Sequence, residues 1–288
     1  MFHFFASTGA MIEAPLLLAL ALGLAVGAVL ALTGAGGAII AVPLLVFGLG
    51  LTVAEAAPVA LLAVALAASI GALMGFRAGV LRYKAAAVMS AFGLALSPLG
   101  LWASSRMPNE PLALIFSLVL MYVAFNMYRQ AQRELAGLSS DDSCGPPCLL
   151  DQTRGKLTWT LPCFRAMVLS GMGAGFLSGL LGVGGGFVIV PALKKVTNLP
   201  VRSIIATSLG VITVVSLGGV VGASISGAMQ WAIALPFASG ALIGMVLGRS
   251  LGEKVRGPRL QQAFALFSLI VALSMLIKAT YPIFSALG

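Results

Sequence analysis

Two glycine-rich stretches contain the residues of this chain that are best suited to bind a substrate. Clustered glycines adopt positive φ angles, so they allow a helix to unwind and a new helix to begin. The new helix exposes its first N–H groups and the positive end of its dipole, which together favour an anion. The residues concerned are Gly34, Gly36 and Gly37 with Pro43 in the first stretch, and Gly182, Gly184, Gly185 and Gly186 with Pro191 in the second.

Small hydroxyl side chains in neighbouring apolar segments could add donors to such a site. The pair Thr207-Ser208 is the most concentrated one within a long apolar segment, so it is the first candidate for substrate contact. Alternatively, the hydroxyls bond carbonyls of their own helices and the glycines only permit close helix packing. That alternative suits isolated glycines better than the clusters. The other hydroxyl candidates are Thr33, Ser69, Ser97, Ser178 and Thr213.

Reactive side chains are scarce within the apolar segments. All eight acidic residues lie at segment ends or in loops, and the single histidine, His3, lies near the N-terminus. Because embedded charges usually mark proton or ion paths, this distribution argues against an intramembrane protease and a carboxylate-based cation pump. It also argues against a histidine-bound metalloenzyme. We expect no enzyme activity and no cofactor.

The three cysteines form a separate candidate site. Cys144, Cys148 and Cys163 all lie in the most polar stretch of the chain, and thiolates four positions apart in a turn can share a soft metal. The spacing is not the usual two-residue one, no histidine lies nearby, and a cytosolic loop keeps its thiols reduced. We therefore expect a solvated turn, with a metal or redox role as the alternative.

The composition identifies the elements that must position these residues. Hydrophobic residues make up 60% and charged residues 9% of the chain, with a mean hydropathy of +1.07, whereas ordinary soluble domains have about 25% charged residues. The long apolar runs predict an all-α integral membrane protein in a lipid bilayer. The net charge of +9 lies mostly between the runs, so it reflects membrane topology and implies no nucleic-acid partner.

The two glycine stretches belong to a tandem duplication. Gly34 and Gly182 are 148 positions apart, as are Pro43 and Pro191, and an ungapped register runs from about Gly23 to Met127 and from Gly171 to Met275. Each copy holds five apolar segments, which is an odd number. The second copy is therefore expected to cross the membrane in the opposite direction, which is the inverted-repeat architecture of secondary transporters.

The apolar runs predict about ten membrane segments. Residues 37–50 and 185–196 would form only about 20 Å and 18 Å of helix, against about 30 Å of hydrocarbon, so we expect two half-helices. The others are expected near residues 15–33, 55–76, 85–105, 111–129, 165–181, 203–226, 230–249 and 259–280. Residues 15–130 then form the first repeat, 131–163 a linker and 164–281 the second repeat.

The basic residues predict the orientation of the segments. With the N-terminus outside, 15 of the 17 Lys and Arg residues fall in inside loops, which leaves Arg106 and Lys278 outside. Cytoplasmic loops carry such an excess. We therefore expect both termini outside and the linker in the cytoplasm.

The paired glycine-proline motifs, the duplicated layout and the cytoplasmic linker resemble the sulfite exporter TauE/SafE family of bacterial and archaeal inner-membrane permeases. The resemblance covers nearly the whole chain apart from the linker and the first dozen residues. It implies export of a small sulfur-containing anion, such as sulfite, sulfoacetate or a related organosulfonate, with both motif loops lining the substrate site. In the first copy Ala38 stands where the second has Gly186.

Two hypotheses follow. In the first, the chain is a secondary transporter that exports the anion by alternating access, and the anion is held at the bilayer midplane by both half-helix N-termini and Ser or Thr hydroxyls. In the second, it is a membrane scaffold or metal permease whose cytoplasmic cysteine loop handles a thiol or metal. Replacement of all three cysteines separates them.

Overall fold

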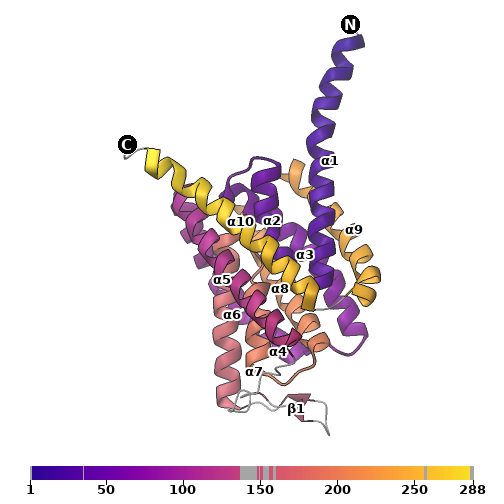
Figure 1. The fold of residues 1–288 in the computed structure, drawn as a ribbon, viewed down its shortest axis with the longest axis vertical. Helices are drawn as coiled ribbons and strands as arrows, with labels where there is room; N and C mark the ends of the chain where they lie inside the picture. Colours follow the sequence, from indigo (N-terminus) through magenta and orange to yellow (C-terminus); the bar gives the residue numbers. More distant parts are fainter. Residues whose placement is uncertain are drawn as a thin grey trace.

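The computed structural model describes residues 2–34, 36–136, 148, 150–151, 156–157, 160–255 and 258–285. This part of the chain is all-helical, as predicted, except for a two-residue antiparallel pair in the linker (Figure 1). The pair, β1 (Leu150–Asp151) with β2 (Lys156–Leu157), was not predicted. The helices are α1 (Phe2–Thr33), α2 (Gly36–Gly48), α3 (Val53–Arg77), α4 (Tyr83–Arg106), α5 (Asn109–Leu135), α6 (Leu161–Leu181), α7 (Gly186–Val196), α8 (Val201–Ile225), α9 (Trp231–Val255) and α10 (Pro258–Ser285).

The helices fit a protein that crosses a membrane many times. Within the described residues, seven helices are long and apolar enough to span a bilayer: α1, α3, α4, α5, α6, α8 and α9. In α10 the described apolar stretch is shorter, Gln262–Ile277. Helices α2 and α7 have 13 and 11 residues, which confirms the two predicted short helices after the glycine stretches.

Helices α3 and α8 lie at the centre of the molecule. Of their apolar spans, 61% is buried, against 33–44% for the other five candidate spans. The two pack against each other, while α1 packs along α9, α4 along α6 and α5 along α10. Figure 1 shows α10, in yellow, lying across α5. The short helices pack against several of these helices, α2 against α1 and α3, and α7 against α6 and α8.

Glycines bring the helix backbones into direct contact at positions that recur along the chain. A side chain at Gly27 of α1 would strike the carbonyl of Ala241 in α9, and one at Gly175 of α6 would strike the carbonyl of Gly93 in α4. Gly175 follows Gly27 by 148 positions, and Ala241 follows Gly93 by the same number. Small residues allow this close approach in membranes. The two contacts are thus the same contact made once by each half of the sequence.

The boundaries of the long helices follow from their capping residues. Thr52 precedes α3, where its hydroxyl accepts from the Glu55 N–H at 3.3 Å and the Glu55 carboxylate accepts from the Thr52 N–H at 2.9 Å. Before α6, the Thr160 hydroxyl accepts from the Cys163 N–H at 3.3 Å. Such caps satisfy donors that a helix start leaves unpaired. No such side-chain cap occurs at α7, whose capping residue is Gly185.

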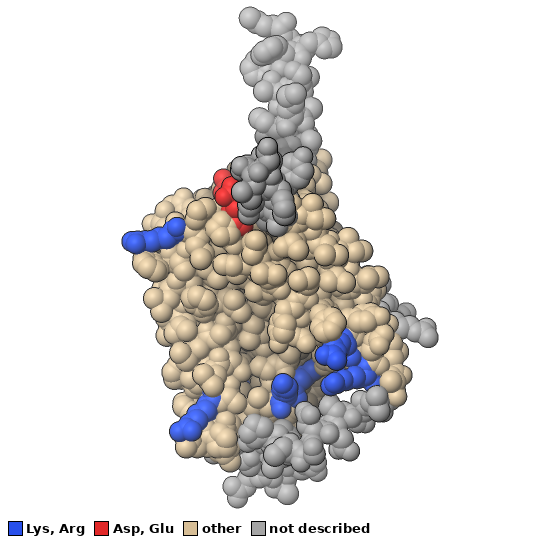
Figure 2. All heavy atoms as spheres, turned by 60° about the vertical axis from the view of Figure 1, so that its left-hand side comes forward, with Lys and Arg blue, Asp and Glu red and all other residues tan. Residues whose placement is uncertain are grey.

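On one face of the molecule, charged side chains lie toward its upper and lower ends (Figure 2). On the face shown in Figure 2, most Lys and Arg side chains lie in the lower half, and acidic side chains lie near the upper edge. The broad middle of this face carries uncharged side chains only. This band agrees with a protein embedded in a bilayer.

Candidate anion site

The second glycine stretch forms a buried loop between α6 and α7. Helix α6 ends at Leu181, and Gly182 caps it in the left-handed region, with φ 71° and its N–H donating to the Ser178 carbonyl at 2.9 Å. Gly184 and Gly185 also have φ angles of 66°, and helix α7 begins at Gly186. Because residues with side chains rarely adopt this conformation, the glycines are required for the loop's shape.

The backbone of this loop offers a run of unused donors. Within the described part of the chain, the N–H groups of the five successive residues 183–187 make no hydrogen bond of good geometry, although all five residues are buried. The last two belong to the first turn of α7, where a helix leaves its donors unpaired. The next two N–H groups, those of Val188 and Ile189, both donate to the Gly185 carbonyl, at 3.1 and 3.3 Å. A buried unpaired donor costs about 1–3 kcal/mol. Successive N–H groups in such a turn form an anion-binding concavity, and here they coincide with the positive end of a helix dipole.

The first glycine stretch also holds donors without acceptors, since the N–H groups of the buried residues Gly37 and Ala38 make no hydrogen bond within the described part of the chain. Gly34 has φ 77° and its N–H donates to the Leu30 carbonyl at 2.8 Å. The next residue, Ala35, lies outside the described residues, and α2 begins at Gly36. Gly34 faces Ile205 of α8, just as Gly182 faces Ala57 of α3, 148 positions earlier. The two loops therefore occupy corresponding places against the central helices.

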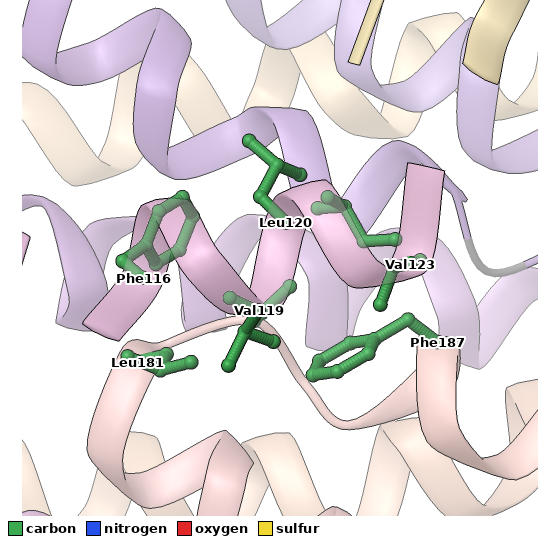
Figure 3. A pocket seen from close by; sticks show the side chains of 8 residues that line it. Phe116, Val119, Leu120, Val123, Leu181 and Phe187 are labelled. Atoms are coloured by element: carbon green, nitrogen blue, oxygen red, sulfur yellow. The ribbon is translucent and has the colours of Figure 1, made fainter. Parts of the chain in front are cut away.

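An apolar cavity lies where the two short helices approach each other. Its volume is about 10 Å³, which is about the space of one water molecule. Figure 3 shows Leu181 and Phe187 at the two ends of the second loop, which passes below Val119 of α5. The cavity therefore joins both glycine-initiated helices to α5. Its lining comprises Ile39, Phe116, Val119, Leu120, Val123, Leu181, Val183 and Phe187.

Most of the predicted hydroxyl candidates bond to backbone groups. The Ser208 hydroxyl donates to the Ile205 carbonyl at 2.9 Å, and that of Ser69 to the Leu66 carbonyl at 2.7 Å. Thr33 and Thr213 likewise bond carbonyls four residues earlier. These four hydroxyls thus follow the alternative in which small polar groups satisfy themselves within their helix.

Three of the candidates stand apart from that pattern. Thr207 accepts a hydrogen bond from the backbone N–H of Arg82 at 3.1 Å, so it links α8 to the segment between α3 and α4. Ser178 is fully buried one turn before the second loop, and its hydroxyl has no partner within the described residues. Ser97 of α4 is also buried and unpartnered there. Among the candidates, Ser178 therefore combines a free hydroxyl with proximity to the loop in sequence.

Ser216 of α8 is a polar residue beside the loop that sequence reasoning missed. It is fully buried, and its hydroxyl has no partner in the described part of the chain. A Cβ atom placed on Gly184 would lie 2.8 Å from the Ser216 Oγ atom. The corresponding position 148 residues earlier is Ala68. Because the hydroxyl is not repeated, no spacing in the sequence could identify it.

The prolines of both motifs lie within the short helices. Pro43 is the eighth residue of α2 and Pro191 the sixth of α7. An internal proline removes one backbone donor and weakens the turn before it. The prolines thus follow the glycine loops by one to two helical turns and are not among the residues that line the cavity.

The expectation for the cysteines is wrong in one respect. Cys148 and Cys163 form a disulfide, and both are fully buried rather than part of a solvated turn. The Cys148 N–H donates to the carbonyl of Val196, the last residue of α7, at 3.0 Å. The linker is thus tied to the start of α6 and the end of α7. Two oxidised cysteines supply no thiolates for a metal, and Cys144 lies outside the described residues.

Comparison with known proteins identifies the family to which the sequence is similar. Residues 19–275 match the family described as "Sulfite exporter TauE/SafE". A protein of Xylella fastidiosa (strain Temecula1) named "Probable membrane transporter protein" is 28% identical over 254 residues, covering 86% of this chain and 90% of that relative. "Probable membrane transporter protein YunE" of Bacillus subtilis (strain 168) is 39% identical over 82 residues, covering 28% and 30%. No solved structure matches this chain.

Proposed function

Since this chain belongs to the sulfite exporter TauE/SafE family, we propose that it exports a small sulfur-containing anion by alternating access. The substrate class is sulfite, sulfoacetate or a related organosulfonate. The family and the relatives make the chain a multi-pass membrane transporter and not an enzyme, in agreement with the sequence analysis. The choice of an anion rests on the chemistry of the second glycine loop.

The observation that carries this proposal is the run of five buried N–H groups between Val183 and Phe187 that make no hydrogen bond of good geometry within the described residues. Water or a ligand must satisfy such donors when they are buried. An oxyanion of sulfur offers several acceptor atoms at one point, so it matches a run of donors. The positive end of the α7 dipole adds roughly half a charge at the same place.

An inverted repeat is the second part of the proposal. Residues 15–130 and 164–281 would form two five-segment units around the linker 131–163, with α2 and α7 as the half-helices. The paired contacts support this arrangement, because Gly27 meets Ala241 as Gly175 meets Gly93, at one constant offset. In transporters of this kind, substrate sites lie near the midplane between such repeats.

The proposed orientation has both termini outside and the linker on the cytoplasmic side of a bacterial or archaeal cell membrane. It rests on the charges alone, because the Cys148–Cys163 disulfide in the linker is a bond that the cytosol normally keeps reduced and so argues for the opposite side. The excess of basic residues in loops on the linker side supports the cytoplasmic placement. An inside-negative potential then assists export by about 2.3 kcal/mol per charge for each 100 mV. Because all eight acidic residues lie at segment ends or in loops of the sequence, a uniporter is a simpler mechanism than proton antiport.

Transport by reconstituted protein tests the proposal. Proteoliposomes would be loaded with radiolabelled sulfite, and a potassium diffusion potential would be imposed with valinomycin. We expect efflux that is faster than in empty liposomes, that depends on the potential, and that excess unlabelled methanesulfonate inhibits. Equal efflux with and without protein for sulfite, sulfoacetate and methanesulfonate would contradict the proposal.

The scaffold or metal-permease alternative receives no support from the described residues. Within them no group of three His, Cys, Asp or Glu residues could hold a metal ion. The disulfide also removes two of the three cysteines that the alternative requires. A single transporter function is therefore proposed.

A further inference from the structure

The position of Ser216 assigns it a part in the substrate site. The residue belongs to α8, one of the two central helices, and it is separated in sequence from the glycine loop by about 30 residues. Its Oγ atom nevertheless occupies the space next to Gly184, where any side chain would meet it at 2.8 Å. The other atoms around that space belong to Val64 and Ile212, which are apolar. The hydroxyl is therefore the only polar group among the three nearest neighbours of Gly184.

A buried serine in a helix normally bonds a carbonyl of its own helix. Ser208 and Thr213 do so on this same helix α8, at 2.9 and 2.8 Å. Ser216 has full burial and no such bond within the described residues. Its free hydroxyl lies against a loop whose N–H groups are also free. The Ser216 hydroxyl and the loop that carries these N–H groups, from two separate elements, are thus neighbours at Gly184.

We propose that the Ser216 hydroxyl donates a hydrogen bond to an oxygen of the transported anion while the N–H groups of residues 183–187 bind its other oxygens. This inference rests on the proposed function and deepens it. The ligand class is an oxyanion of sulfur with several terminal oxygens, as in sulfite and methanesulfonate. The anion sits on the second loop, because the first half has Ala68 at the position of Ser216 and Leu30 at the position of Ser178.

The presence of donors on both the second loop and helix α8 also predicts which anions should bind well. A group of donors from a loop and from a separate helix surrounds an anion on two sides, so it suits three terminal oxygens better than a single atom. Chloride can accept from the same donors, but it is a single acceptor atom, whereas sulfite and methanesulfonate each offer three oxygens. We therefore expect selectivity for sulfite and methanesulfonate over chloride, and a loss of this selectivity when the hydroxyl is removed.

Ser216→Ala tests the assignment, with Ser268→Ala as its matched control. Ser268 of α10 is also buried and unpartnered within the described residues, but it does not adjoin the loop. The measurement is the thermal stability of each purified protein, without ligand and across titrations of sulfite, methanesulfonate and chloride. A hydrogen bond to a charged group corresponds to a roughly ten- to hundredfold change in affinity.

Ser216→Ala should weaken sulfite binding by that factor, and Ser268→Ala should leave it unchanged. Without ligand, Ser216→Ala should melt at the wild-type temperature or above, because it removes a buried group with no partner. A lower melting temperature of the ligand-free variant would indicate a structural role and overturn the assignment. Unchanged sulfite binding by Ser216→Ala would overturn it while leaving the proposed function intact. If the wild type binds none of the anions and transports none, both fail.

Discussion

The two glycine loops share their packing but differ in their chemistry. Gly34 and Gly182 face the central helices α8 and α3 at corresponding residues, Ile205 and Ala57. Around the second loop, however, Ser178 and Ser216 are buried and unpartnered, and the corresponding residues of the first half are Leu30 and Ala68. The two loops thus make backbone contacts at the same offset of 148 residues, whereas the buried hydroxyls without partners lie beside the second loop only.

The largest loss of stability is expected where glycines bring two helix backbones into contact. Gly27→Ala and Gly175→Ala should each destabilise the protein by about 3 kcal/mol, the upper end for overpacking, because the added methyl strikes a carbonyl of the neighbouring helix. Gly173→Ala is the control, since nothing lies within 4 Å of its Cβ position. Thermal melting of the purified variants measures this. A large loss for one of the two variants but not the other would break the correspondence between the halves.

The disulfide lies in the linker, which it ties to the start of α6. The bond closes a loop of 15 residues between Cys148 and Cys163, for which the chain-entropy model gives about 3 kcal/mol. Reduction by dithiothreitol should therefore lower the melting temperature of the wild type. The variant Cys163→Ser should melt lower from the start and show no response to dithiothreitol. A wild-type melting curve that reductant leaves unchanged would argue against a stabilising bond.

Gly184 and Gly36 occupy corresponding positions in the two glycine stretches, so replacing each of them compares the two loops in substrate binding. Gly184→Ala forces a side chain to φ 66° and toward the Ser216 Oγ atom at 2.8 Å, whereas Gly36 begins a helix. Strain of this kind costs about 1–3 kcal/mol. We expect Gly184→Ala to reduce sulfite transport at least roughly tenfold and Gly36→Ala to reduce it much less. Equal losses would mean that both loops bind the substrate equally.

The smallest effect is expected from adding a hydroxyl to the first half. Ala68 is fully buried at the position that corresponds to Ser216. If the substrate sits on the second loop only, Ala68→Ser should change sulfite affinity by less than about twofold, within the scatter of ordinary substitutions. The measurement is the same ligand titration followed by thermal stability. Tighter binding by this variant would show that the first loop also takes part.

Sequence patterns predicted the architecture better than the polar contacts. Glycine runs followed by Pro43 and Pro191 indicated short helices, because only clustered glycines allow a chain to reverse and restart a helix there. Long apolar runs located the other helices. These features depend on local backbone preferences and on burial in lipid. Both can be recognised from short stretches of sequence, as glycine clusters and as long apolar runs.

The polar contacts depend on which helices meet, and a sequence alone does not provide this. Ser208 looked like a substrate contact but bonds its own helix, whereas Ser216, eight residues later, faces Gly184. The pairing of Cys148 with Cys163 was missed for a different reason, because the expected compartment argued against disulfides. The contact of Cys148 with the end of α7 could not be inferred from the composition of the linker.

A structure of the protein determined by electron cryomicroscopy with sulfite bound tests the central claim most directly. The account predicts density for the anion within hydrogen-bond distance of the N–H groups of residues 183–187 and of the Ser216 Oγ atom. Density at the basic side chains of the loops, with the glycine loop still without acceptors, would contradict it.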